Sequence, residues 1–139
     1  MFQFAVKNRI SFSMESTLSG KSVLRRIKTA KENGFYVRLN YIALDKVEIN
    51  LARLAARVRS GGHFIDEATI RQRYSISAQH LLLAPPYCDE AFIYDNSEAQ
   101  PNLIFWIDQG RIAVMRFRQP EWCRRLQQKL HTLSYQTTE

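Results

Sequence analysis

The chain has 139 residues, of which 45% are hydrophobic and 12% are aromatic, and this composition predicts one packed domain rather than a disordered chain. No apolar run approaches the roughly 20 residues of a membrane span, and the first ten residues lack the apolar core of a signal peptide. We therefore expect no membrane association. Cys88 and Cys123 stand alone, without metal-ligand spacing or a disulfide framework. Isolated cysteines suit a reducing cytoplasm, which is the expected location.

The net charge of +7 calls for an anionic partner. Most of the basic residues are arginine, whose rigid guanidinium fork suits phosphate groups. A nucleotide phosphate and a nucleic acid both meet this description. The alternative is a surface of mixed charge that serves only solubility.

Hydrophobic periodicity and turn signals divide the chain into alternating strands and helices. Gly34 supplies a helix stop, Asp45 and Asp66 stand in helix-cap positions, and Pro120 suits the first turn of a helix. The expected elements are a strand over 11–14, a helix over 19–33, a strand over 35–44, a helix from Asp45 to Gly61, a helix from Asp66 to just before Pro85, a strand over 91–94, hairpin strands over 103–107 and 111–117, and a helix from Pro120 to about 133.

This order predicts a single α/β domain over residues 1–139. Strands separated by helices imply a parallel sheet flanked by helices, with right-handed crossovers. The C-terminal hairpin and helix, about 103–133, follow that sheet. In an open α/β sheet, ligands bind just beyond the carboxyl ends of the strands.

The segment Gly20-Lys21-Ser22 looks like the end of a phosphate-binding loop. That loop needs a glycine five residues before the Gly-Lys pair, and Glu15 stands there. We instead interpret Glu15 and Thr17 as substrate-site candidates just past the strand over 11–14. On this interpretation Lys21 is an ordinary residue in the first turn of the following helix.

Five arginines surround the Gly61-Gly62 pair, in a region of about 53–74 that we interpret as a lid. Arg57, Arg71 and Arg73, together with His63, are candidate nucleotide ligands, and Arg57 and Arg71 are the candidate catalytic residues. Guanidinium groups closing over a phosphate neutralise transition-state charge. We expect Arg57 and Arg71 to converge on one crevice. Arg73 is the weaker member of the set, because it lies two residues beyond Arg71 and so points about 200° away around a regular helix. The alternative is a solvated arginine surface on two helices.

Other candidates are weaker. Asn96, just after the strand over 91–94, could contact an adenine edge or merely form a turn. His80 and His131 lie in helical stretches and are expected to be surface residues. No pair of histidines has metal-ligand spacing, so we expect no resident metal. No Ser/His/Asp set is evident either.

Taken together, several motifs resemble the zeta-toxin-like branch of P-loop kinases over roughly residues 5–115. The resemblance is carried by Phe12-Ser-Met-Glu-Ser-Thr-Leu-Ser-Gly20, Gly34-Phe-Tyr-Val-Arg-Leu-Asn-Tyr-Ile-Ala-Leu-Asp45, Arg57-Val-Arg-Ser-Gly-Gly-His63, Ile70-Arg-Gln-Arg-Tyr74 and Tyr94-Asp-Asn-Ser97.

The resemblance implies a P-loop NTPase-like fold that transfers the γ-phosphate of ATP, with Mg²⁺, to a hydroxyl acceptor. In zeta toxins proper that acceptor is UDP-N-acetylglucosamine. Glu15 and Thr17 would then face the acceptor, Arg57, His63, Arg71 and Arg73 would form the lid, and Asn96 would lie near the base. This sequence lacks the P-loop segment that opens the family's fold. We therefore expect an N-terminally incomplete kinase domain that is inactive alone and binds neither ATP nor Mg²⁺ tightly.

Three functional hypotheses follow. The first is this kinase domain, and the second is a non-catalytic nucleotide- or partner-binding module of the same fold. Its partner would be an antitoxin, a complementing N-terminal fragment or a second copy that pairs with an unpaired sheet edge. The third is nucleic-acid binding through the arginine surface.

Overall fold

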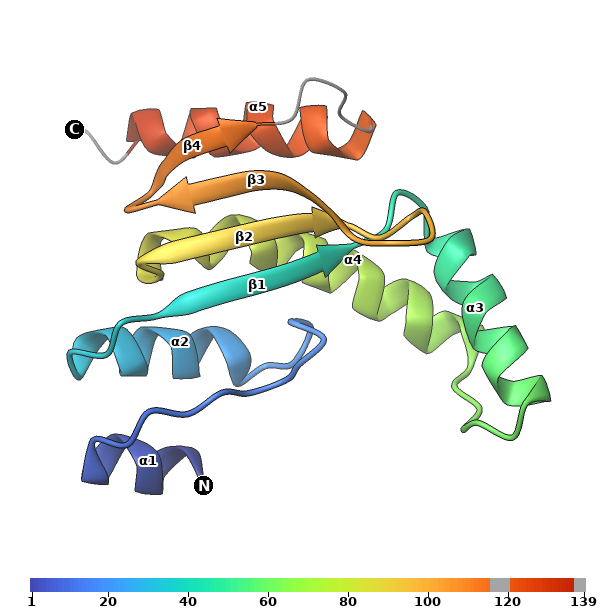
Figure 1. Ribbon diagram of the computed structural model, residues 1–139, viewed down its shortest axis with the longest axis horizontal. Coiled ribbons are helices and arrows are strands. Elements are labelled where there is room, and N and C mark those ends of the chain that lie inside the picture. The colour runs from blue at the N-terminus through green and yellow to red at the C-terminus, as the bar shows by residue number, and fades with distance from the viewer. Residues whose placement is uncertain (116–120, 137–139) are drawn as a thin grey trace.

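The computed structural model describes residues 1–115 and 121–136 (Figure 1). The helices are α1 (Phe2–Asn8), α2 (Val23–Glu32), α3 (Val47–Arg59), α4 (Glu67–Leu83) and α5 (Glu121–Gln136), with a short 3₁₀ helix η1 (Pro85–Tyr87). The strands are β1 (Arg38–Ala43), β2 (Glu90–Asp95), β3 (Asn102–Asp108) and β4 (Arg111–Met115).

The strands form one sheet in the order β1-β2-β3-β4, which is also their order in the chain. β1 and β2 are parallel, whereas β2–β3 and β3–β4 are antiparallel. The mixed α/β class predicted from the sequence is confirmed. The parallel arrangement holds for β1 and β2, which are joined by α3 and α4 as a crossover connection requires.

Helices cover one face of the sheet. Side chains alternate along a strand, and the inward-facing set includes Ile93, Phe105 and Ile107, each almost wholly buried. Residues of α2, α4 and α5 pack against this set. The cluster consists of Leu18, Leu81, Ala91, Ile93, Ile104, Phe105, Ile107, Cys123 and Leu126, with Val23, Ile27, Leu39, Tyr41, Leu82, Ile112 and Trp122 packed around it. The core therefore lies between the sheet and these three helices.

The strand predicted over 11–14 is wrong. This stretch pairs with no strand in the described structure. Instead the Phe12 ring lies between the rings of Phe2 and Phe35, with centroid distances of 5.6 and 5.8 Å. Alternation of apolar and polar residues is compatible with a strand, but a strand also needs a neighbour to satisfy its backbone. The first element of the chain is the helix α1.

Helix boundaries differ from the sequence prediction at two places. α2 begins at Val23, so Lys21 lies ahead of the helix and not in its first turn. The cap of α3 is Lys46, and Asp45 makes no capping bond; the Asp45 backbone N–H donates to Ser97 Oγ at 2.8 Å.

Other local signals are confirmed. Gly34 follows α2 with φ of 82°, and Asp66 caps α4 by accepting a hydrogen bond from the Thr69 backbone N–H at 2.9 Å. The hairpin is present as β3 and β4. Pro120 and the predicted end of β4 at residues 116 and 117 lie outside the described residues.

Candidate ligand-binding site

A cavity of about 420 Å³ lies between the end of β1 and the helices α3, α4 and α5. Its apolar lining includes side chains that are buried in the fold, namely Ala43, Leu54, Ile70, Leu81 and Leu126, together with the exposed Ile42. Hydroxyl and amide groups of Thr17, Tyr41, Asn50, Tyr74 and Ser77 also line it. The cavity therefore suits a ligand with an apolar or aromatic part and a few hydrogen-bonding groups.

Four cationic side chains line the cavity: Arg57 from α3, Arg73 from α4, and Arg125 and Lys129 from α5. No Asp or Glu is among its lining residues in the part of the chain that the structure describes. Within those residues, neither Arg57 nor Arg73 lies within the 4.0 Å ion-pair distance of a carboxylate. A cavity lined by charge of one sign attracts ligands of the opposite sign.

The face of α4 toward the cavity follows helical periodicity. Arg73 and Tyr74 lie three and four residues after Ile70, Ser77 and Leu81 follow at the same helical spacing, and all five line the cavity. Arg73 therefore shares a face with buried residues of the same helix. The sequence interpretation included Arg73 among the nucleotide ligands but ranked it below Arg71, because the two point in different directions around a regular helix.

Two tyrosine hydroxyls fix α4 against the end of β1. Tyr74 donates to the carbonyl oxygens of Leu44, at 2.9 Å, and Asp45, at 3.1 Å. Tyr41 Oη and Ser77 Oγ lie 2.9 Å apart. Burial raises the pKa of both Tyr41 and Tyr74, so both hydroxyls keep their protons at neutral pH.

The Gly61-Gly62 pair ends α3 about one helical turn after Arg57. Gly61 has φ of 94° and donates to the Val58 carbonyl at 3.0 Å, while Gly62 donates to the Arg57 carbonyl at 2.8 Å. These two bonds are a Schellman motif. A Cβ on Gly62 would lie 2.9 Å from the Arg57 carbonyl oxygen, so the pair closes the helix tightly and positions Arg57.

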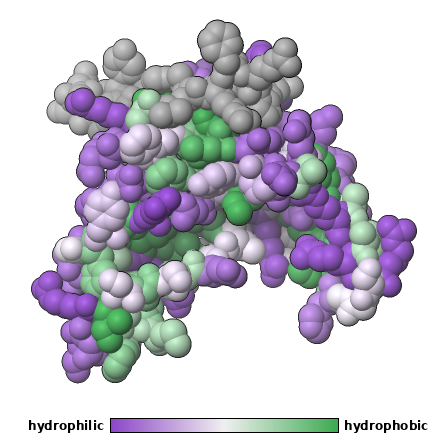
Figure 2. Space-filling view, viewed as in Figure 1, coloured by the Kyte–Doolittle hydropathy of each residue, from purple (hydrophilic) through white to green (hydrophobic). Residues whose placement is uncertain are grey.

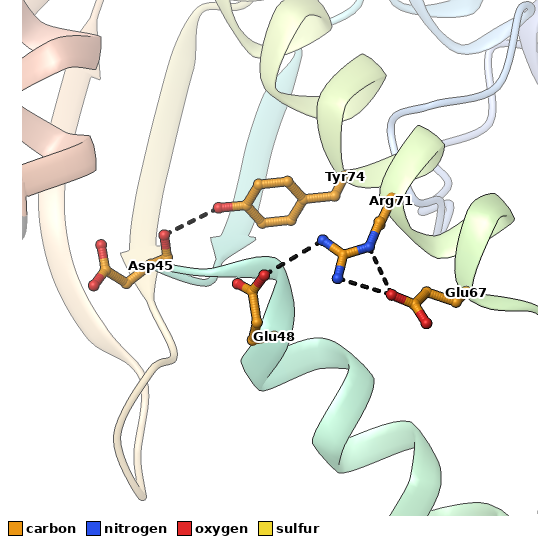
Figure 3. A network of polar contacts seen from close by, with 5 residues as sticks. All are labelled: Asp45, Glu48, Glu67, Arg71 and Tyr74. Atoms are coloured by element: carbon orange, nitrogen blue, oxygen red, sulfur yellow. Dashed lines mark hydrogen bonds and ion pairs between the residues drawn. The ribbon is translucent and has the colours of Figure 1, made fainter.

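The expectation that Arg57 and Arg71 converge is not met, because Arg71 does not line the cavity. Its guanidinium lies between Glu67 and Glu48, at 2.8 and 3.3 Å (Figure 3). Hydrogen bonds to Glu67 and then Glu48 raise the pKa of Arg71. The pair with Glu48 ties α4 to α3 on the surface, so Arg73, rather than Arg71, accompanies Arg57 at the cavity.

The structure brings Thr17 to the cavity but not Glu15, His63 or Asn96. Glu15 and His63 are exposed. The backbone N–H of Asn96 donates to the Ala43 carbonyl at 2.8 Å, which extends the pairing of β1 and β2 one residue past β2. Of the residues proposed from the sequence, Thr17, Arg57 and Arg73 therefore meet at one site.

The sequence interpretation missed the contribution of α5. Trp122, Arg125, Leu126 and Lys129 line the cavity at helical spacing, and this periodicity was available in the sequence.

The Trp122 indole N–H donates to the buried carboxylate of Asp95 at 3.3 Å. Asp95 also accepts from Ser97 at 2.7 Å. This network fixes α5 to the end of β2.

Within residues 1–115 and 121–136, no three His, Cys, Asp or Glu side chains group as a metal site would require. Among the same residues, no helix combines the length and apolar character needed to cross a membrane.

An uncharacterized protein of Haemophilus influenzae is 65% identical to this chain over 74 residues. The match spans 53% of this chain and 53% of that protein, about half of each. No family model matches the chain, and no solved structure matches it.

Proposed function

We propose that the cavity binds a phosphorylated small molecule and that the chain is a P-loop-kinase-like domain related to zeta toxins. The observation that carries the proposal is the set of four cations with no carboxylate among the described lining residues. Arg57 and Arg73 would bind phosphate oxygens, since guanidinium groups form strong charge-assisted hydrogen bonds to them. The apolar walls would hold the base of a nucleotide or nucleotide sugar.

Phosphoryl transfer needs more than this cavity. ATP bound with Mg²⁺ requires a P-loop and oxygen ligands for the metal. This sequence has no complete P-loop motif, and the cavity offers Mg²⁺ no carboxylate among its described residues. The residues present fit a phosphate but not the metal, so we derive no catalytic step through ATP and propose binding without turnover.

Calorimetric titration with UDP-N-acetylglucosamine and with ATP tests this proposal. Arg57→Gln and Arg73→Gln should each weaken binding by about tenfold, which is the loss of one charge-assisted hydrogen bond. Arg59→Gln is the matched control, because Arg59 lies on α3 but does not line the cavity. Absence of binding, or an equal loss in the Arg59 variant, would contradict the proposal.

A partner-binding module is the second candidate function, and the edge of the sheet favours it. Among the described strands, β1 pairs only with β2, so its other edge carries unpaired backbone groups. Ile42 on this strand is 59% exposed. Figure 2 shows further apolar side chains gathered over α1, where Phe4 is 64% exposed. Such an edge invites a strand from another chain, whether an antitoxin, a complementing fragment or a second copy.

Sedimentation velocity over a range of protein concentrations tests the self-pairing form. If β1 pairs with a second copy, the chain should sediment as a dimer that Ile42→Lys converts to a monomer, because an inserted charge blocks edge pairing. Lys46→Gln, just past β1, serves as the control. A monomer at all concentrations would leave the small-molecule proposal as the better account.

Binding to nucleic acid is the third candidate, and the net charge of +7 is its support. A single-stranded oligonucleotide should then bind with a steep inverse dependence on salt. Binding that is insensitive to salt, or absent, would exclude this reading.

A further inference from the structure

We propose that a second hollow, the groove between the loop ahead of α2 and α4, is a phosphate-binding subsite continuous with the cavity. The groove has a volume of about 950 Å³ and is more open than the cavity. In Figure 1 the loop ahead of α2 lies beside α4, and Figure 2 shows that the outline of the molecule is notched on this side. This inference rests on the proposed function, because the groove would hold a further part of the ligand that the cavity binds.

The groove is lined by hydrogen-bonding groups and cations. Ser16, Ser19 and Lys21 come from the loop, and Thr69, Gln72 and His80 come from α4. As in the cavity, no Asp or Glu stands among the lining residues that the structure describes. Hydroxyl, amide and ammonium groups together suit the oxygens of a phosphate and the hydroxyls of a sugar.

Two residues join the groove to the cavity. Thr17 and Arg73 line both hollows. A ligand extending from one to the other would pass between these two side chains. Its phosphate would then lie between the Arg73 guanidinium and the Lys21 ammonium, with the apolar part in the cavity. The ligand class is a phosphate or diphosphate ester that carries an apolar or aromatic group at one end.

The loop that carries these groups is fixed from within. Leu18 is 4% exposed and has φ of 59°, a strained conformation for a residue with a side chain. Its carbonyl lies 2.6 Å from His80 Nδ1, and because a carbonyl only accepts, Nδ1 carries the proton. His80 is half-buried rather than a surface residue as the sequence suggested. Strain at a buried residue persists where surrounding contacts enforce it, and such positions cluster at ligand sites.

Inorganic pyrophosphate is the probe, because it has no apolar part to occupy the cavity. NMR titration of the ¹⁵N-labelled chain should shift the amides of residues 16–21 and 69–80. Lys21→Gln should weaken pyrophosphate binding about tenfold. Lys28→Gln should not, since Lys28 lies farther along the same segment, over the Tyr87 ring and outside the groove. Shifts elsewhere, or equal losses in both lysine variants, would overturn the subsite.

His80 is proposed as a positioning residue and has its own test. His80→Ala removes the donor to the Leu18 carbonyl and should weaken pyrophosphate binding. His80→Asn keeps an N–H at the same place and should restore it. Thermal melts of both variants show whether the fold persists, and a loss in the alanine variant that asparagine does not rescue would refute the positioning role.

The two proposals fail in distinguishable ways. Lys21-dependent binding of pyrophosphate without binding of UDP-N-acetylglucosamine or ATP would retain the groove and reject the nucleotide ligand. Nucleotide binding that depends on Arg57 but not on Lys21 would retain the cavity and reject the groove.

Discussion

The hydroxyl of Tyr74 lies 2.9 Å from the carbonyl oxygen of Leu44 and so fixes α4 to the end of β1. Replacing Tyr74 with phenylalanine keeps the ring but removes the donor. We expect Tyr74→Phe to lower the free energy of unfolding by about 1 kcal/mol, measured by urea denaturation. Tyr87→Phe is the control, because Tyr87 is 37% exposed on η1. Equal effects in the two variants would contradict the assigned role.

Gly62 tests the closing turn of α3. Gly62→Ala places a Cβ 2.9 Å from the Arg57 carbonyl oxygen, a backbone atom that cannot move without disturbing the helix end. We expect a destabilisation of about 1–3 kcal/mol and weaker ligand binding, because Arg57 would shift. In Gly20→Ala, the nearest atom to the new Cβ is Val23 Cγ2 at 3.4 Å, and φ is not positive. That variant should leave the free energy of unfolding nearly unchanged.

The sequence predicts those features of the fold and the site that depend on neighbouring residues. Caps such as Asp66 and stops such as Gly34 are local, and both were predicted correctly. The sequence also indicates which residues share one face of α4, since Arg73 lies three residues from the buried Ile70. The motif pattern instead favoured Arg71, which the carboxylates of Glu48 and Glu67 hold at the surface.

The remaining features depend on contacts between distant segments. Nothing near Leu18 in the sequence indicates that His80 holds its carbonyl, 62 residues away. Likewise, the alternating residues of 11–14 suit a strand, but only the fold shows that no neighbouring strand is available to them in the described structure.

Asp89 should give the fold a defined dependence on pH. Its carboxylate accepts hydrogen bonds from the Lys31 ammonium and from the Val37 backbone N–H, the latter at 2.7 Å. Burial opposes the charge, but these bonds outweigh burial and lower the pKa of Asp89 below its ordinary value of 3.8. A lowered pKa in the folded state means that the stabilisation is present at neutral pH and is lost as the pH falls below about 4.

Asp89→Asn should therefore cost about 1–3 kcal/mol at pH 7 and less at pH 3, where the carboxylate begins to take up a proton. Urea denaturation at the two pH values measures this difference. Glu32→Gln is the control, because Glu32 is exposed on the same helix as Lys31. An Asp89→Asn penalty that is the same at pH 3 and pH 7 would show that the charge is not responsible.

The two cysteines should be unreactive in the folded protein. Cys88 is 5% exposed and Cys123 is 0% exposed, and burial raises the pKa of each thiol to about 12. The thiolate is the reactive form, so both should react slowly with an aromatic disulfide reagent at pH 8 and rapidly in urea. Ser60→Cys provides an exposed thiol for comparison. Labelling of Cys88 at the rate of that thiol would show that the region opens.

The chain should bind phosphate ligands without transferring phosphate. Phosphoryl transfer needs backbone amides, a lysine and a metal ligand arranged together around the nucleotide. Here Glu15 occupies the place of the first P-loop glycine, and the Leu18 backbone N–H donates to Ser16 Oγ at 3.2 Å instead of being free to bind phosphate. Lys21 lies ahead of α2 and lines a groove, where it can attract an anion. With ATP, Mg²⁺ and UDP-N-acetylglucosamine, a radiolabelled γ-phosphate assay should show no turnover above background, and Lys21→Ala should leave that background unchanged. Multiple turnovers that Lys21→Ala abolishes would establish instead that this segment works as a catalytic phosphate loop.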